Sequence, residues 1–251
     1  IRTMAKPPAW HCGRQNCSGR AAAHRGCGWP NMTQRHAHLR IVSACFPDLA
    51  MDRWRRITAQ QRTLPGDDVP VVLAQQGTHG PVIHALSMAA RERGIMQGAR
   101  VVDVQAIHPD LHVEQADVQG DQAMLNRVAH WARRWCPWTV RDGTDGIVMD
   151  VTGAAHLFGG EPALLRDMGV RFKMQGLTTR LAIAPTRGAA QMLARYGTAS
   201  TICGADDVAA LLPPLSVAAL RIDIDTVRLL QRLGLKTIGA LDAMPRVAMM
   251  R

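Results

Sequence analysis

Residues 145–153 combine acidic groups with a short apolar run in a way that suits phosphoryl-transfer chemistry. Asp145 precedes the run and Asp150 follows it. Sites that transfer nucleotides hold two Mg²⁺ ions with several convergent carboxylates. The residue beside Asp145, however, is Gly146, which brings no charge. The segment therefore predicts a buried strand entered from a polar turn, at a site suited to nucleic acid but poorly suited to a pair of cations.

Nearby acids also have structural interpretations that compete with metal binding. Asp142 and Asp145 flank Gly143, an arrangement typical of a tight turn. A turn or cap role for Asp145 is therefore as well supported as a remnant of a metal site. Asp48 follows Pro47 directly before a helical pattern, and we expect its side chain to cap that helix.

A second candidate site lies near the end of the chain, where Lys236 and Thr237 stand between Gly234 and Gly239. In helix-hairpin-helix elements, backbone N–H groups and a nearby cation hold a DNA phosphate without reading the base sequence. An ordinary glycine turn between packed helices is the alternative. We favour phosphate binding by these four residues, because the family resemblance described below adds to it.

Apolar periodicity and turn residues divide the chain into alternating strands and helices. Strands are predicted at 39–46, 69–74, 81–85, 139–140, 146–151 and 179–184. Helices are predicted at 49–61, 87–94, 101–107, 121–135, 160–175 and 187–195. After Pro213 and Pro214 only short helices follow, at 216–220, 224–233 and 238–244. We therefore expect an α/β (α+β) sheet domain followed by an all-helical segment.

The chain of 251 residues carries a net charge of +10, which favours a polyanionic partner such as nucleic acid. Residues 1–47 contain no acidic residue and supply most of that charge.

Residues 1–38 lack apolar periodicity, so we predict a disordered basic extension. Its Cys and His spacing fits no compact zinc site; the candidate ligands are His11, Cys12, Cys17, His24 and Cys27. With no apolar leader and no apolar run long enough for a membrane span, we expect a cytoplasmic, nucleoid-associated protein with reduced thiols.

Five segments resemble, in order and spacing, parts of the Y-family (UmuC-like) translesion DNA polymerases, and more closely their catalytically degenerate ImuB-like branch. The most specific is Met149-Asp-Val-Thr-Gly-Ala-Ala-His-Leu-Phe-Gly-Gly160, which is similar to the second palm strand and its loop. The others are 41–50 (first palm strand), 90–99 (fingers), 181–185 (third palm strand) and 232–241 (helix-hairpin-helix). Any one alone is weak, but their common order makes coincidence improbable.

The resemblance implies that the metal site is degenerate. Active members need one Asp at the end of the first palm strand and an Asp-Glu pair before the second. The corresponding positions here are Cys45, Asp145 and Gly146, so one carboxylate of three remains. Hard cations prefer oxygen ligands, and the Cys45 thiol is a poor replacement.

The resemblance also places the nucleotide-contacting positions. The steric-gate aromatic falls at or near Ala50, and the fingers tyrosine at Met88. The partner arginine is retained as Arg91, and Arg187 replaces a phosphate-contacting lysine. We therefore expect Arg91 and Arg187 to be remnants of a nucleotide or phosphate site, with no catalytic residue and no resident metal.

The implied architecture is a palm formed by 39–56 and 119–198, fingers at 57–118 and a thumb at 199–251. Family members continue into a little-finger domain and a tail with sliding-clamp contacts. We expect both to be absent from this chain.

The function implied is a non-catalytic DNA-binding scaffold in SOS-type repair and error-prone translesion synthesis. Its expected partners are DNA, the sliding clamp, a RecA-like accessory protein and an error-prone catalytic polymerase; no membrane partner is expected. One alternative is an active low-fidelity polymerase, which would use Mg²⁺. Another is a basic module that binds nucleic acid through its N-terminal extension alone.

Overall fold

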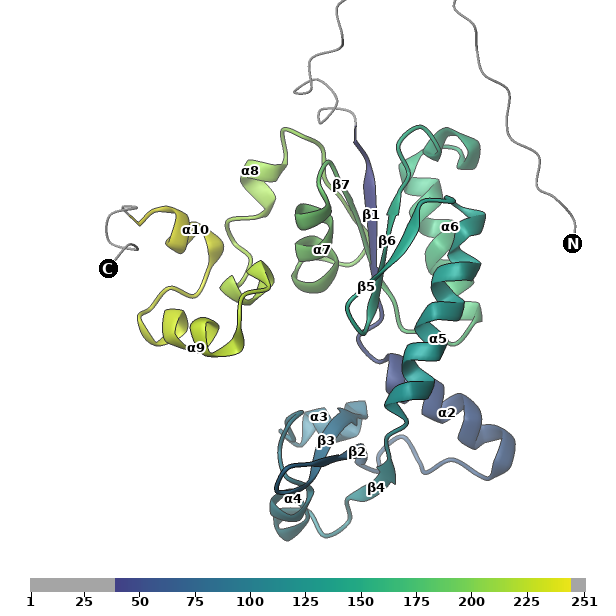
Figure 1. The fold of residues 1–251 in the computed structure, drawn as a ribbon, viewed down its shortest axis with the longest axis vertical. Coiled ribbons are helices and arrows are strands. Elements are labelled where there is room, and N and C mark those ends of the chain that lie inside the picture. Colours follow the sequence, from purple (N-terminus) through teal and green to yellow (C-terminus); the bar gives the residue numbers. More distant parts are fainter. Residues whose placement is uncertain (1–38, 245–251) are drawn as a thin grey trace, which may run out of the picture. The chain divides into compact units, whose positions relative to one another are not determined.

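The computed structural model describes residues 39–244. The predicted disordered extension at 1–38 and its cysteine and histidine residues lie outside this range. In the described part, the chain forms two β-sheets and a series of helices (Figure 1).

The larger sheet has five strands in the order β5-β6-β1-β7-β8. They are β1 (Ile41–Cys45), β5 (Thr139–Asp142), β6 (Gly146–Asp150), β7 (Arg180–Ala184) and β8 (Thr201–Ile202). The central strand β1 pairs antiparallel with both β6 and β7. Because β1 lies between two strands that come much later in the chain, the sheet brings distant segments to one edge.

Helices cover both faces of this sheet (Figure 1). On one face lie α5 (Val118–Trp131) and α6 (Glu161–Met174), and on the other lies α7 (Arg187–Tyr196). Side chains alternate along β1: Val42 and Ala44 belong to the core against α5 and α6, whereas Cys45 packs on the α7 side. This alternation decides which helix can reach the end of β1.

The smaller sheet has the order β3-β2-β4. Its strands are β2 (Val71–Gly77), β3 (Gly80–Leu86) and β4 (His112–Gln115), and its helices are α3 (Met88–Glu92) and α4 (Val101–Ile107). Helix α2 (Leu49–Gln61) leads from β1 into this sheet. A separate core lies between the sheet and α3–α4; it includes Val72, Ile83 and Leu111.

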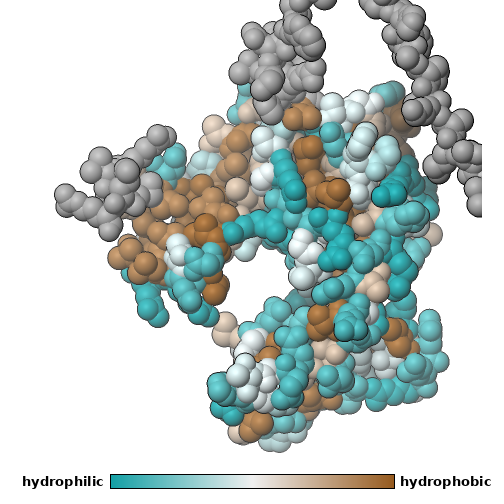
Figure 2. Space-filling view, in the orientation of Figure 1, coloured by the Kyte–Doolittle hydropathy of each residue, from teal (hydrophilic) through white to brown (hydrophobic). Residues whose placement is uncertain are grey.

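Short helices follow β8: α8 (Val208–Leu211), the 3₁₀ helix η3 (Val217–Leu220), α9 (Ile224–Arg232) and α10 (Ile238–Asp242). Leu215 and Ala219 from this segment join the core on the α7 side of the large sheet. Figure 2 shows a largely hydrophobic surface over this segment, where Ile224, Leu229 and Leu233 are exposed. The segment is helical as expected, and its role as a thumb stays a prediction.

The predicted elements agree with most of the structure, and the differences have local causes. Helix α5 begins before the predicted residue 121, because Asp117 caps it by accepting a hydrogen bond from the Gly120 N–H. Two further 3₁₀ turns, η1 (Ala132–Arg134) and η2 (Ala155–Phe158), follow α5 and β6. The short elements β4, β8 and α8 are absent from the prediction, since a few residues give too little periodicity to detect.

No helix in the range 39–244 is long and apolar enough to cross a membrane. The cysteines at 45, 136 and 203 are buried thiols.

Phe172 provides a test of the core that holds α5 and α6 on the sheet. It is fully buried, and its ring centroid lies 5.1 Å from that of Phe46 in an edge-to-face pair. We expect Phe172→Ala to lower the free energy of unfolding by about 3–5 kcal/mol. Met174→Ala, two residues along the same helix and 78% exposed, should change it by less than about 0.5 kcal/mol. Urea denaturation measures both, and equal effects would contradict this packing.

Candidate functional site

The strand register brings the predicted site residues into one row at the end of the large sheet. Cys45 of β1 pairs with Gly146 of β6, and Gly146 pairs in turn with Asp142 of β5. On the other side, Cys45 pairs with Arg180 of β7. Asp145 directly precedes β6 at the same edge. Cys45, Asp145 and Gly146 therefore meet at one place, as their spacing in the sequence cannot reveal.

An arginine from α7 binds the acid at the centre of this row. The two guanidinium nitrogens of Arg195 donate to the two carboxylate oxygens of Asp145, at 2.7 and 2.8 Å. Nη1 of Arg195 also lies 2.9 Å from the Sγ of Cys45. Arg195 can reach this point because Cys45 lies on the α7 side of the sheet. The remaining acid of the degenerate site is thus bound bidentately by an internal cation.

Asp142 forms the second part of the cluster, and its side chain is 2% exposed. Its carboxylate accepts hydrogen bonds from Arg221 at 2.6 Å, Arg187 at 3.2 Å and Arg195 at 3.4 Å. Burial raises the pKa of Asp142, but its bonds to Arg221 and Arg187 and the charge of Arg195 outweigh burial and hold that pKa below its ordinary value. We call Cys45, Asp142, Asp145, Arg187, Arg195 and Arg221 the arginine–aspartate cluster.

Cys45 contributes no charge to the arginine–aspartate cluster at neutral pH. Burial raises the pKa of its thiol to about 12, although the Arg195 charge acts in the opposite direction. Asp145 also favours the protonated thiol, because the Sγ donates weakly to it over 3.7 Å. The cluster thus contains three guanidiniums against two carboxylates and carries an excess positive charge.

The residues present do not fit a pair of magnesium ions. Mg²⁺ requires an octahedral shell of oxygen ligands, but the two positions that the resemblance assigns to further acids hold a thiol, Cys45, and a glycine, Gly146. The surviving Asp145 carboxylate has both oxygens bound by Arg195. Within the described range 39–244, no group of three or more His, Cys, Asp or Glu side chains is arranged to hold a metal. The donor set is that of an ion-pair cluster.

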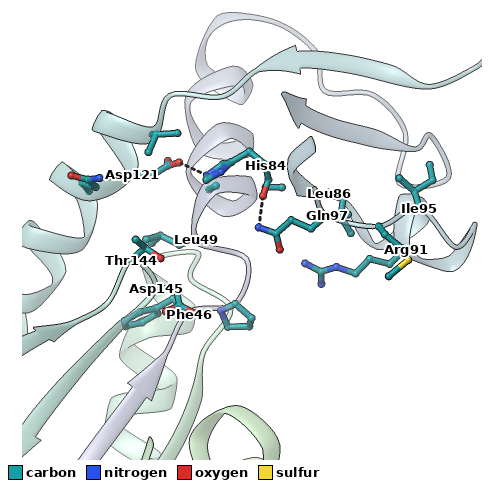
Figure 3. Close-up of a pocket in the computed structure, with 16 residues that line it drawn as sticks. Phe46, Leu49, His84, Leu86, Arg91, Ile95, Gln97, Asp121, Thr144 and Asp145 are labelled. Atoms are coloured by element: carbon teal, nitrogen blue, oxygen red, sulfur yellow. Dashed lines mark hydrogen bonds and ion pairs between the residues drawn. The ribbon is translucent and has the colours of Figure 1, made fainter. Parts of the chain in front are cut away.

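A cavity of about 490 Å³ adjoins the arginine–aspartate cluster (Figure 3). Phe46, Leu49, Ala50, Thr144 and Asp145 line it from the side of the large sheet. The small sheet and its loops contribute His84, Leu86, Arg91, Ile95 and Gln97. The volume suits a small-molecule ligand.

Arg91 and Ala50, both placed by the resemblance at nucleotide-contacting positions, line this cavity. The guanidinium of Arg91 pairs with the carboxylate of Asp48. The prediction that the Asp48 side chain caps α2 is therefore wrong: Asp48 occupies the N-cap position but makes no capping hydrogen bond. The Asp48 carboxylate accepts from the charged guanidinium of Arg91, more than 40 residues away in the sequence, instead of from a backbone N–H of α2. Met88 is 59% exposed and is absent from the cavity lining.

Another ion-pair group closes the side of the cavity near α5. Asp121 is 7% exposed and accepts a hydrogen bond from Arg53 at 3.2 Å. The Nε2 atom of His84 lies 3.7 Å from the other carboxylate oxygen, as Figure 3 shows. Burial raises the pKa of Asp121, although Arg53 lowers it. This group links α2, α5 and β3 beside the cavity.

The predicted phosphate site at Gly234, Lys236, Thr237 and Gly239 is engaged within the protein. Gly234 adopts a φ of +84°, as a glycine turn requires. The Gly239 N–H donates to the carbonyl of Pro213 at 2.8 Å, and the Thr237 hydroxyl caps α10. The N–H of Lys236 donates to the Gly234 carbonyl. A phosphate-binding role stays a prediction, and it now rests on the Lys236 side chain instead of on these amides.

Arg195 and Arg221 are the site residues that the sequence prediction lacks. Arg195 lies about two helical turns after Arg187, so both arginines can face the same edge of the sheet; this spacing was a usable signal. Arg221 follows η3 in a left-handed conformation with a φ of +57°. That conformation is rare for arginine, and nothing in the local sequence points to it.

The fold defines a class of protein. A crystal structure of DinB from Sulfolobus solfataricus superposes with a TM-score of 0.68 at 15% identity, covering 84% of this chain and 62% of that chain. An insertion ternary complex of Dbh DNA polymerase gives a TM-score of 0.69 at 15% identity, with the same coverage. The architecture is therefore the mixed α/β palm and fingers of Y-family polymerases. Accordingly, we call the large sheet with its helices the palm and the small sheet with its helices the fingers.

The family follows from the sequence comparison. The model of the impB/mucB/samB family matches residues 56–195, which is more than half of the chain. The chain therefore belongs to the impB/mucB/samB family. It is 39% identical over 153 residues to Protein ImuB from two strains of Caulobacter vibrioides, and this match covers 61% of the chain. The chain spans about a third of those relatives' length (33%). The resemblance to Y-family polymerases and their ImuB-like branch is confirmed.

The pH dependence of stability tests Asp142. Because its folded-state pKa lies below the ordinary value, its stabilisation is complete above about pH 4 and is lost as the pH falls through the folded pKa. We expect Asp142→Asn to cost about 2 kcal/mol at pH 7, less than a fully buried pair, since Arg187 and Arg221 are about half exposed. The difference between wild type and variant should be constant from pH 8 to 5 and shrink below about pH 4, as followed by thermal melting.

Asp52 is the matched control for this experiment. Burial raises its pKa, despite hydrogen bonds from Thr178 that lower it. A raised folded-state pKa means that the native protein gains stability as the pH falls through that pKa. The difference between wild type and Asp52→Asn should therefore change in the opposite direction on acidification. Parallel curves for the two variants would contradict the charge assignment of the arginine–aspartate cluster.

Proposed function

We propose that this protein is a non-catalytic, DNA-binding member of the Y-family fold that acts in SOS-type repair and error-prone translesion synthesis. One observation carries the proposal: the guanidinium of Arg195 binds both carboxylate oxygens of Asp145, at the point where an active palm gathers acids around metal. Nucleotidyl transfer needs cations that activate the attacking oxygen and the leaving group. A guanidinium that is paired with an aspartate can activate neither the attacking oxygen nor the leaving group.

The charge of the palm edge supports DNA binding without catalysis. Arg187 and Arg221 are 56% and 44% exposed while they share Asp142, so their outer N–H groups remain open to solvent. An excess of guanidinium groups attracts phosphates without reading sequence. Figure 2 shows hydrophilic surface over this end of the palm.

The relatives support the finer parts of the proposal. One structural neighbour is an insertion ternary complex of Dbh DNA polymerase, and the matching relatives are ImuB proteins of Caulobacter vibrioides. We extend from them to binding of primer–template DNA and to partners in lesion bypass: a sliding clamp, a RecA-like accessory protein and a catalytic error-prone polymerase. The chain spans about a third of the length of those relatives. We therefore propose DNA as the partner of this chain, and we propose the protein partners for a protein of the relatives' full length.

Primer extension separates this proposal from an active polymerase. With Mg²⁺ or Mn²⁺ present, the full chain should incorporate no nucleotide, because one acid of three remains and that acid is bound by Arg195. DNA binding, followed by fluorescence anisotropy, should persist and weaken by about tenfold or more when salt is raised from about 50 to 200 mM. Robust extension that disappears in Asp145→Ala would reject the proposal.

Two variants locate the DNA contacts. Removal of residues 1–38 should lower the affinity for DNA but leave measurable, salt-sensitive binding. Complete loss of binding would assign all DNA contacts to the basic extension.

Lys236→Ala should reduce the slope of the logarithm of the DNA-binding constant against the logarithm of the salt concentration by about 1 if the Lys236 ammonium contacts a phosphate. Lys173→Ala, an exposed lysine on α6, is the control and should leave the slope unchanged.

A further inference from the structure

We propose that Arg195 is a resident cation that takes the place of the divalent ions in this palm, so that the site is complete without metal. The inference concerns the arginine–aspartate cluster alone. It stands whether or not the protein binds DNA, and it goes beyond the proposed function by assigning what neutralises the acids at this edge of the sheet.

The contacts of Arg195 are those that a bridging cation makes. Its guanidinium touches three strand ends through Cys45, Asp142 and Asp145, with nitrogen-to-ligand distances from 2.7 to 3.4 Å. The side chain is only 17% exposed, whereas Arg187 and Arg221 in the same cluster are 56% and 44% exposed. Arg195 is therefore the inner cation, and the other two lie on its solvent side.

Gly146 provides the room that this arrangement needs. A Cβ atom at position 146 would lie 3.2 Å from Nη2 of Arg195 and 3.2 Å from the carbonyl oxygens of Ala44 and Asp142. The two carbonyls are backbone and cannot move away easily, so a side chain at this position would crowd the guanidinium and shift it by a few tenths of an ångström. The glycine that removes an acid from the site thus also makes space for the guanidinium, and the two residues act as a pair.

Cys45 completes the charge balance. A buried, protonated thiol accepts a contact from Arg195 without adding a negative charge. The guanidinium therefore pairs most closely with Asp145, at 2.7 and 2.8 Å, whereas Asp142 contacts it at 3.4 Å and also binds Arg187 and Arg221. Because Arg195 is covalently part of α7, this cation does not dissociate, and the palm edge keeps its structure at any magnesium concentration.

Thermal melting of the 251-residue chain, with Mn²⁺ as the probe, tests the assignment. The wild type should melt at the same temperature in EDTA and in millimolar Mn²⁺. Arg195→Ala should melt at a lower temperature in EDTA and recover part of the loss in Mn²⁺, because Asp145 then loses the guanidinium that binds both of its oxygens, while Asp142 keeps Arg187 and Arg221. Arg195→Ala/Asp145→Asn should show no such recovery, which also controls for Mn²⁺ binding elsewhere in the chain.

A second experiment keeps Arg195 in place and restores the acids. Cys45→Asp/Gly146→Glu should bind Mn²⁺ weakly, as measured by electron paramagnetic resonance, because the arginine still competes for the carboxylates. The triple variant that adds Arg195→Ala should bind at least tenfold more tightly. This comparison reads metal binding directly and does not depend on how well Arg195→Ala folds alone.

Two outcomes would overturn the assignment. One is a wild type stabilised by Mn²⁺ as strongly as Arg195→Ala, since the site would then accept metal with the arginine present. The other is equal Mn²⁺ affinity of the double and triple variants, which would show that Arg195 does not occupy the metal position. Primer extension and DNA binding by the wild type are measured separately, so a failure of this assignment can be distinguished from a failure of the proposed function.

Discussion

The bidentate pairing of Arg195 with Asp145 is the interaction on which the arrangement of the palm edge depends. It joins a helix to the turn that enters β6 and, through Asp142, to the end of β5. In a low-dielectric site, unpaired carboxylates repel each other and cost free energy. A polymerase meets that cost with bound metal, whereas this protein meets it with its own side chain. The acids at this edge of the fold are therefore neutralised by a side chain of the protein itself.

The pairing follows from strand geometry more than from any single residue. Antiparallel register fixes Cys45 opposite Gly146 and Gly146 opposite Asp142, so a change at one of these positions is felt at the others. The alternation of β1 turns Cys45 toward α7, and Arg195 of that helix lies against its thiol. Arg221 then brings the segment after η3 to the same carboxylate, at 2.6 Å. One buried acid thus orients three parts of the chain that are distant in sequence.

The sequence predicts the palm and fingers well because their signals are local. Apolar runs, glycine turns and the order of five segments define the strands and helices, and Cys45, Asp145 and Gly146 emerge as one site from their resemblance alone. The cation that fills the site is harder to foresee, because it depends on tertiary placement. Asp48 also has a partner that its local sequence does not predict. Its position favours a helix cap, yet its carboxylate forms an ion pair with Arg91 of the fingers. Asp48 and Asp145 thus each pair with an arginine that is distant in the sequence, so the residues next to them do not predict their partners.

A guanidinium and a magnesium ion neutralise the same charge but permit different chemistry. Magnesium exchanges its water ligands, accepts a substrate oxygen and polarises it. A guanidinium presents N–H donors in a fixed plane, has no vacant coordination position and remains protonated at neutral pH. It can orient a phosphate but cannot generate an alkoxide from a sugar hydroxyl. The proposed replacement of metal by Arg195 thus keeps an electrostatic support for this edge of the palm and omits the step that makes a phosphodiester bond.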